Sequence, residues 1–292
     1  LPTLTTKRRE GKVLIGGKDH LRHVATERTG ASRPKIYEMS LGSPVDYQCI
    51  ESSVIVPVTK ELLQIAESEG APFRPFVRAT RTARALLAIR EEFKTAKVIR
   101  AFADDDLSTR DTSLYPAGHT ATPSTKWDQA NSDPFGDIRK AREKVYKATG
   151  VEANTIILPY EVALVLLDHA QYLDRRPGAE DLTQIGTIVS PLRGLNVLIA
   201  GAPFFNGTNL SSIWGDDVWV GIVDPAPVAE EAFGFGVTVV YDGPGSTVEG
   251  VKIQEMVPQD TGRGWEVVAT TGEWDKVKLV PEAGYLIYDV LT

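Results

Sequence analysis

Apolar residues recur every three or four positions over residues 75–102, and basic residues occupy much of the remaining surface. This spacing predicts a long amphipathic helix, and Pro75 stands in its first turn, where a helix tolerates proline. At about 1.5 Å per residue the helix would be roughly 40 Å long, so it is expected to act as a structural spine. Its predicted apolar positions are Phe76, Ala79, Ala83, Leu86, Leu87, Ile89, Phe93, Ala96 and Ile99.

The chain before this helix has the pattern of extended structure. Residues 10–58 combine short apolar runs with turn-rich polar stretches, and the β-branched run at 54–58 predicts a strand. Pro57 interrupts that run and cannot donate to a ladder, which favours an edge strand or a strand end. A short helix is expected from Thr59 or Lys60 to Ser68. Because little of residues 10–45 is apolar, we expect this stretch to find partners on another chain.

The second half of the chain changes from helical to strand-like periodicity. Residues 103–126 are rich in Asp, Ser, Thr, Pro and Gly, which predicts a loop and a boundary between domains. The elements expected after it are helices over 133–150, 159–175 and 182–192, and strands over 154–158, 196–201, 218–223, 235–241, 251–256, 265–270 and 285–290. A helix-rich middle followed by a strand-rich end predicts an α+β fold.

Composition narrows the class of protein. The 292 residues are 42% hydrophobic and 24% charged, as in ordinary globular proteins, and no apolar run approaches the roughly 20 residues of a membrane helix. The single cysteine, Cys49, excludes an internal disulfide and is interpreted as a small core residue. The sequence starts without Met or a signal-peptide pattern, which fits a processed or an incomplete N-terminus.

The net charge of −7 is unevenly distributed. Residues 1–36 hold nine basic and three acidic residues, a local charge of +6, so the rest of the chain carries −13. This asymmetry predicts a basic arm on an acidic body. The arm could be a solvated terminus, or dock on the acidic surface of a neighbouring copy, or bind DNA, although it lacks interleaved aromatic residues. If it docks, loss of residues 2–10 would impair assembly and leave the monomer folded.

Candidate chemistry is sparse. The zinc-protease, nucleophile-elbow and phosphate-loop patterns are absent from the sequence. The four histidines, interpreted as surface or structural residues, are His20, His23, His119 and His169. An acidic cluster lacks the spacing of a calcium loop and is interpreted as a solvated helix end; it consists of Asp104, Asp105, Asp106 and Asp111. Asn206 and Asn209 begin two glycosylation-type triplets but are interpreted as turn residues. We therefore expect no catalytic residue, cofactor or metal.

Several segments, taken in order, resemble one known family. Examples are Ser132-Asp133-Pro134-Phe135-Gly136-Asp137-Ile138, followed by Thr149-Gly150 and by Asn154-Thr155-Ile156. The other segments are 91–96, 127–128, 160–169, 213–218 and 283–287. Together they resemble the major capsid proteins of tailed phages over residues 40–292. The resemblance implies the α+β Hong Kong 97 phage capsid fold.

In that family the chain is divided into arms and two domains. The resemblance implies an N-terminal arm over residues 1–20, an extended loop over 21–58, a peripheral domain over 59–118 and 237–292, and an axial domain over 119–236. Pentamers and hexamers of the chain would assemble in the host bacterial cytoplasm into the icosahedral virion head. The head would enclose double-stranded DNA without sequence-specific binding, and neither a membrane nor an enzymatic activity is implied. Portal, scaffolding, protease and decoration proteins are the other partners of the family.

Two alternatives stay open. An encapsulin-type compartment has the same fold but encloses cargo proteins instead of DNA. The alternative from a different class is a soluble hydrolase or sugar-binding protein with an unrecognised site. The oligomeric state separates the second alternative from a shell protein, because a shell protein forms a large homo-oligomer.

Overall fold

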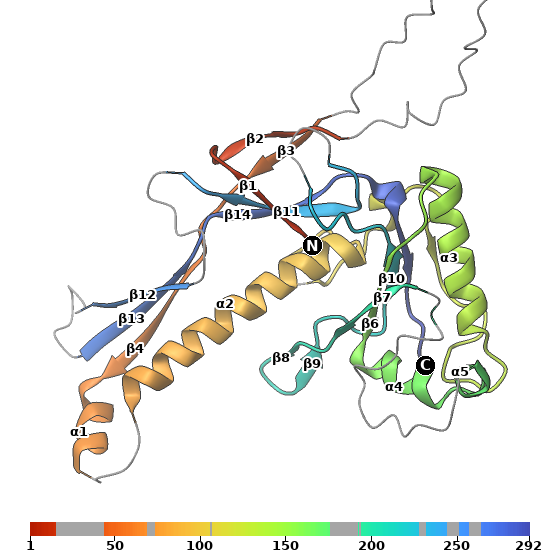
Figure 1. Ribbon diagram of the computed structural model, residues 1–292. Coiled ribbons are helices and arrows are strands. Elements are labelled where there is room, and N and C mark those ends of the chain that lie inside the picture. Colours follow the sequence, from red (N-terminus) through yellow and green to blue (C-terminus); the bar gives the residue numbers. More distant parts are fainter. Residues whose placement is uncertain are drawn as a thin grey trace, which may run out of the picture.

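The computed structural model describes residues 1–15, 44–68, 74–105, 107–175, 192, 194–227, 232–243, 251–256 and 264–292. They form an elongated wing joined to a thicker body (Figure 1). The wing consists of helices α1 (Lys60–Ser68) and α2 (Pro75–Arg100) and the sheet β12–β13–β4. The body is built on the five-stranded sheet β5–β15–β10–β6–β7.

Helix α2 confirms the predicted spine. It has 26 residues, runs from Pro75 to Arg100 and is ended by Ala101, whose φ of 57° breaks the helical run. Small side chains such as Ala79 and Ala83 are buried on the face that packs against the wing sheet. Leu86 was assigned to the apolar face, and this assignment is wrong, because its side chain is 45% exposed while Leu87 is buried.

The wing sheet is antiparallel, with strands β12 (Val251–Met256), β13 (Gly264–Thr271) and β4 (Ser53–Thr59) in that order. Strand β4 is therefore at an edge, as the proline at position 57 predicted. Its inward residues Val54 and Val56 pair with the buried Ala269 and Val267, and this face is covered by α2. The wing is thin, since its described residues form two small clusters of buried side chains.

The body contains the main hydrophobic core. Its sheet strands are β5 (Thr120–Ala121), β15 (Gly284–Ile287), β10 (Val218–Gly221), β6 (Thr155–Pro159) and β7 (Asn196–Ala200). Every residue of β6, β10 and β15 is buried, as expected for strands covered on both faces. Helix α3 (Pro134–Thr149) packs against β15 and β10. The C-terminal strand thus belongs to the sheet of the body and not to the wing.

Capping residues in the sequence correctly predicted both ends of helix α3, whereas one other helix of the body was predicted wrongly. Asp133 caps α3 by accepting the Gly136 N–H at 2.9 Å, and Gly150 ends it with φ of 75°, both as predicted. The single helix expected over 159–175 is wrong, because the chain forms α4 (Tyr160–Asp168) and α5 (Ala170–Arg175) on either side of an extended His169. The helix expected over 182–192 lies outside the described residues, apart from Leu192.

Five short strands were not predicted. They are β1 (Thr3–Thr6), β5, β8 (Pro203–Phe205), β9 (Leu210–Ser212) and β14 (Trp274–Lys278). The expected strands over 196–201, 218–223, 235–241, 251–256 and 265–270 are confirmed to within two residues, and that over 285–290 is shorter. The unpredicted strands have only two to five residues, so any alternation of apolar and polar positions in them is too short to identify a strand.

The N-terminal residues have partners within their own chain. Strand β1 runs parallel to β11 (Gly236–Tyr241), which also pairs with β14, and β2 (Glu10–Val13) pairs with β3 (Val45–Gln48). The basic side chains Lys7 and Arg9 pair with Asp242 and Glu273 at 2.9 and 2.7 Å. Residues 1–13 therefore have partners within their own chain, and docking of the basic arm on a neighbouring copy stays a prediction. Residues 16–43 lie outside the described part of the chain.

Within the part of the chain that is described, no helix combines the length and the apolar character that crossing a membrane requires.

Candidate functional site

A buried network of charges fastens the end of α2 to the body; we call it the junction. Its members are Arg100, Arg110, Asp216, Asp217 and Asp289. Asp217 is at its centre, with a fully buried side chain. Arg100 donates from Nε and Arg110 from Nη2 to the same Asp217 Oδ2, at 2.6 and 2.7 Å. One fully buried carboxylate thus accepts from two guanidinium groups.

Local turns bring the two arginines together. Ala101 ends α2 in the left-handed region, and the loop that follows folds back on the helix end, where Phe102 and Arg110 form a bridge. The Asp111 N–H donates to the Ala101 carbonyl at 2.7 Å and closes this return. Both guanidinium groups then lie over the Phe102 ring, at 4.9 and 5.3 Å from its centre.

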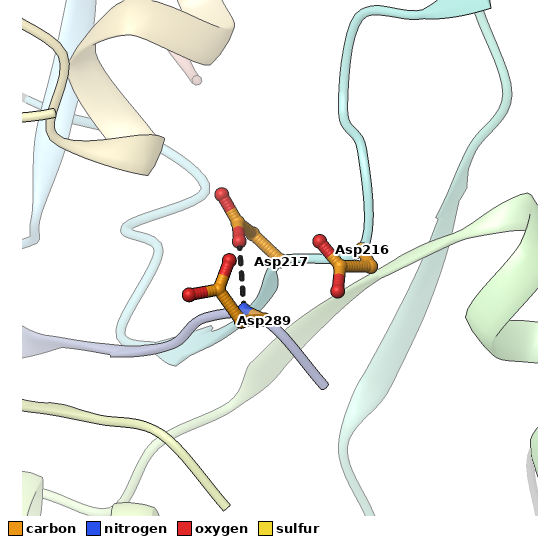
Figure 2. A group of neighbouring side chains, drawn as sticks. All are labelled: Asp216, Asp217 and Asp289. Carbon is orange, nitrogen blue, oxygen red and sulfur yellow. Dashed lines mark hydrogen bonds between the residues drawn. The ribbon is translucent and has the colours of Figure 1, made fainter. Parts of the chain in front are cut away.

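The C-terminal segment completes the junction from the other side. The Asp289 N–H donates to Asp217 Oδ1 at 3.2 Å (Figure 2). The Leu291 N–H donates to Asp216 Oδ2 at 3.1 Å. Arg110 Nη1 lies 3.8 Å from Asp289 Oδ1. The junction therefore ties three distant parts of the chain together: the end of α2, the turn before β10 and the C-terminal residues after β15.

Three acidic side chains of the junction also lie close enough to share a metal ion. Asp217 already accepts two guanidinium donors on Oδ2 and a backbone N–H on Oδ1. A cation placed there would be repelled by the charges of Arg100 and Arg110 and would have to displace their hydrogen bonds. The donor set fits an internal ion-pair network and does not fit a metal site.

Sequence reasoning missed the junction, although one signal was present. Asp216 and Asp217 stand directly before a strand of four buried residues, and a buried carboxylate needs a cationic or hydrogen-bonding partner. The partner could not be identified, because Arg100 is 117 positions away and no periodic pattern links the two.

Gly215 is required by the junction, and its substitution is a direct test. Its φ is +54°, and a Cβ added to it would lie 2.7 Å from Arg100 Nη2. We expect Gly215→Ala to destabilise the subunit by about 2–3 kcal/mol, since left-handed strain of about 1–2 kcal/mol is joined by displacement of the guanidinium. Gly207→Ala is the control, because Gly207 also has positive φ but nothing lies within 4 Å of its added Cβ. Equal losses of unfolding free energy in the two variants, measured by urea denaturation, would contradict a specific clash with Arg100.

The two described histidines have structural surroundings, as predicted. The buried His119 donates from Nδ1 to the Gly284 carbonyl at 3.0 Å and so joins the chain near β5 to β15. His169 accepts the Gln171 N–H on Nδ1, and its Nε2 lies 3.0 Å from Ser132 Oγ. His20 and His23 lie outside the described residues.

The acidic cluster after α2 is an ion-paired helix end. Arg90 and Lys97 both donate to Asp105 at 2.7 Å, and the Lys97 hydrogen bond lowers the pKa of Asp105 despite partial burial. Asp104 accepts from Ser108, and Asp111 caps the short turn at 112–114; Asp106 lies outside the described residues. The cluster thus has partners that explain it without a metal.

Cys49 and the Asn206 segment also match their predicted structural roles. Cys49 is buried, with Sγ donating to the Val239 carbonyl at 3.6 Å, and burial raises the pKa of its thiol to about 11. Asn206 forms a turn, because its Oδ1 accepts the N–H groups of Thr208 and Asn209.

Comparisons with known proteins identify the fold. Neither a family model nor a curated protein sequence matches the chain. Among solved structures, a phage-related protein from Bordetella bronchiseptica RB50 matches with 21% identity and a TM-score of 0.65, covering 99% of this chain and 89% of that one. The SrpI encapsulin of Synechococcus elongatus PCC 7942 matches with 13% identity and a TM-score of 0.57, covering 98% and 84%. A Microbacterium phage Oxtober96 protein matches with 15% identity and a TM-score of 0.54, covering 98% and 88%.

These matches run over nearly the whole chain and include phage proteins and an encapsulin. The chain therefore shares its mixed helix-and-sheet fold with them, and the resemblance found in the sequence is confirmed at the level of the fold.

Proposed function

We propose that this chain is a major capsid protein, which self-assembles into the icosahedral head of a tailed double-stranded DNA phage. The observation that carries the proposal is the likeness of almost the entire chain to phage proteins. The phage-related Bordetella protein matches with a TM-score of 0.65, which is higher than the 0.57 of the encapsulin. The capsid-type sequence segments, found independently of the structure, support the same conclusion.

The division into domains belongs to this proposal. Residues 59–118 and 237–292 form a peripheral domain with α2 as its spine, residues 119–236 an axial domain, residues 1–20 an N-terminal arm and residues 21–58 an extended loop. Helix α2 of the first segment packs on β13 of the second, which supports a peripheral domain of two segments, and β4, almost all of it in the proposed extended loop, pairs with β13 in the same wing sheet. Strand β15 pairs with β10, so the C-terminal end of the peripheral segment returns to the axial sheet.

The physical task of such a chain is repeated association and not chemistry. A thin wing with small clusters of buried residues gains stability when neighbouring copies cover it, and many weak contacts per subunit add up to a stable shell. The junction keeps the wing fixed to the body, so that each copy presents its contact surfaces in the same relative positions. In the proposed shell, the copies form closed rings of five and six subunits. We propose no enzymatic activity, cofactor or membrane contact for the chain.

An encapsulin-type compartment is the second candidate, and the likeness to the Synechococcus encapsulin favours it. The two candidates differ in contents and in location. A phage head assembles in the bacterial cytoplasm with the help of scaffolding or protease proteins, receives DNA through a portal and ends as a virion. A compartment encloses cargo proteins. A soluble hydrolase or sugar-binding protein is the candidate that forms no shell.

Purification of the full chain followed by size-exclusion chromatography and electron microscopy tests the proposal. We expect closed icosahedral particles, because weak contacts repeated around closed rings make the shell the stable species. A monomer or dimer at every protein concentration and ionic strength would contradict any shell function. Particles from infected or lysogenic cells that contain cargo protein and no DNA would favour the compartment over the phage head.

A further inference from the structure

The hairpin of β8 and β9 carries two large apolar side chains into solvent. Phe205 is 65% exposed and Leu210 is 73% exposed, and the two are cross-strand partners at the end of the hairpin. The hairpin projects from the body on the side that faces the wing (Figure 1). Adjacent exposed apolar groups of this size are uncommon on a monomer surface and indicate a contact with another molecule.

The hairpin is held in one conformation at both ends. At its base, the Phe204 ring packs edge-to-face on Phe93 of α2, with 4.9 Å between ring centres. At its tip, Asn206 Oδ1 accepts the N–H groups of Thr208 and Asn209 at 3.0 and 2.8 Å. Gly207 adopts φ of +95°, which the turn requires. A preformed tip loses little conformational entropy when it binds.

The hairpin and the chain on either side of it carry no charged residue. Residues 194–215 contain no Asp, Glu, Lys or Arg, in a chain that is 24% charged. The stretch includes β7, an edge strand of the body sheet, whose Leu198 is 46% exposed. Edge strands on free surfaces are normally protected by charges or proline, and depletion of charge marks the centre of an interface. Because the chain carries −7 overall, an uncharged surface is where like copies approach with little repulsion.

A pocket of about 450 Å³ lies on α3. Its lining combines apolar residues, among them Phe135, Ile138 and Leu192, with charged residues of both signs, among them Arg139 and Glu143. Apolar groups flanked by polar ones are the usual anatomy of a docking site. Helix α3 and the hairpin lie on opposite sides of strands β6, β7 and β10 (Figure 1). One copy therefore cannot fill its own pocket with its own hairpin.

We propose that the β8–β9 hairpin of one copy inserts Phe205 and Leu210 into the α3 pocket of a second copy. The contact joins two different surfaces, so each bound copy still offers one hairpin and one pocket. Head-to-tail contacts of this type close into rings, which is the geometry that pentamers and hexamers require. The inference rests on the proposed shell function and assigns the residues that make its lateral contact.

Chemical cross-linking tests which surfaces meet. In the full chain, Leu210→Cys is combined with Tyr146→Cys, a 53% exposed residue of the pocket lining, and treated with a short bismaleimide. We expect a ladder of covalently linked copies. Leu210→Cys combined with Leu62→Cys, on α1 at the far end of the wing, is the matched control and should give no ladder. The native Cys49 is buried with a raised pKa, so it contributes little background. No ladder from the first pair, or an equal ladder from the control, would overturn the proposal.

A charge at the tip tests the role of the contact in assembly. We expect Phe205→Asp to reduce particle yield at least tenfold and to leave the unfolding midpoint of the subunit unchanged, because the side chain is exposed. Phe205→Leu should restore assembly, since it keeps an apolar tip. If the wild type forms particles and Phe205→Asp forms them equally well, this inference fails while the shell function stands. If the wild type forms no particles under any condition, the shell function itself fails.

Discussion

Replacing Asp217 by Asn is expected to destabilise the unassembled subunit by about 3–5 kcal/mol, the cost of breaking a buried ion pair by removing one partner. Asp217 is fully buried and accepts from two arginines, of which Arg100 is itself nearly buried. The substitution keeps the shape of the side chain but leaves Arg100 without a counter-charge, and it leaves Arg110 with only the more distant and more exposed Asp289. The loss of unfolding free energy is measured from the midpoint of urea unfolding, at a protein concentration at which no particles form.

Asp105→Asn is the matched control for this experiment. Asp105 also accepts from two cationic side chains, Arg90 and Lys97, at the same 2.7 Å distance. Its side chain is 49% exposed, and exposed ion pairs contribute at most about 1 kcal/mol. The two variants therefore differ mainly in burial. If Asp217→Asn cost no more than Asp105→Asn, the junction would not be what holds the end of α2 to the body.

Much of the helical structure follows from local sequence, for reasons that can be stated for each element. Helix α2 buries one face along its length, so its periodicity is visible, and α3 has both its N-cap Asp133 and its C-terminal Gly150. The break at His169 could not be predicted, because the ring is held by Ser132, a residue 37 positions away. Leu86 was misassigned because the wing sheet covers only a narrow stripe of α2.

The long-range features required the structure. Strand β1 is four residues long and threonine-rich, and nothing in it identifies β11 as its partner. The charge asymmetry of the chain was real, but the first basic residues are neutralised by Asp242 and Glu273 of the same chain. The family resemblance did predict the fold, because it uses the order of many segments and does not depend on any single contact.

Loss of the N-terminal strand β1 is expected to have a second large effect on the stability of the subunit. This is the opposite of what the basic charge of the segment alone predicts. From the sequence, residues 2–10 would be dispensable for the fold of the monomer. In the structure, β1 covers one edge of β11, where the Thr238 N–H donates to the Pro2 carbonyl at 2.7 Å and the Asp242 N–H donates to the Thr6 carbonyl at 2.7 Å. Removal of residues 1–6 would expose that edge and the apolar site that Leu4 fills.

Leu4→Ala isolates the packing part of this effect. Leu4 is 6% exposed and belongs to the main core, and truncation of a buried leucine to alanine costs about 2–5 kcal/mol. We expect a value of about 2–3 kcal/mol, near the lower end, because β1 is an edge strand and the site can partly collapse. Thr5→Ala on the same strand is the control, since its side chain is exposed.

If Leu4→Ala left the unfolding midpoint of the unassembled subunit unchanged and reduced only particle yield, the N-terminal residues would act as an assembly arm, as charge alone suggested. A loss of subunit stability before any assembly step would instead make β1 part of the folded subunit, because only a strand already packed in the monomer can change its free energy of unfolding.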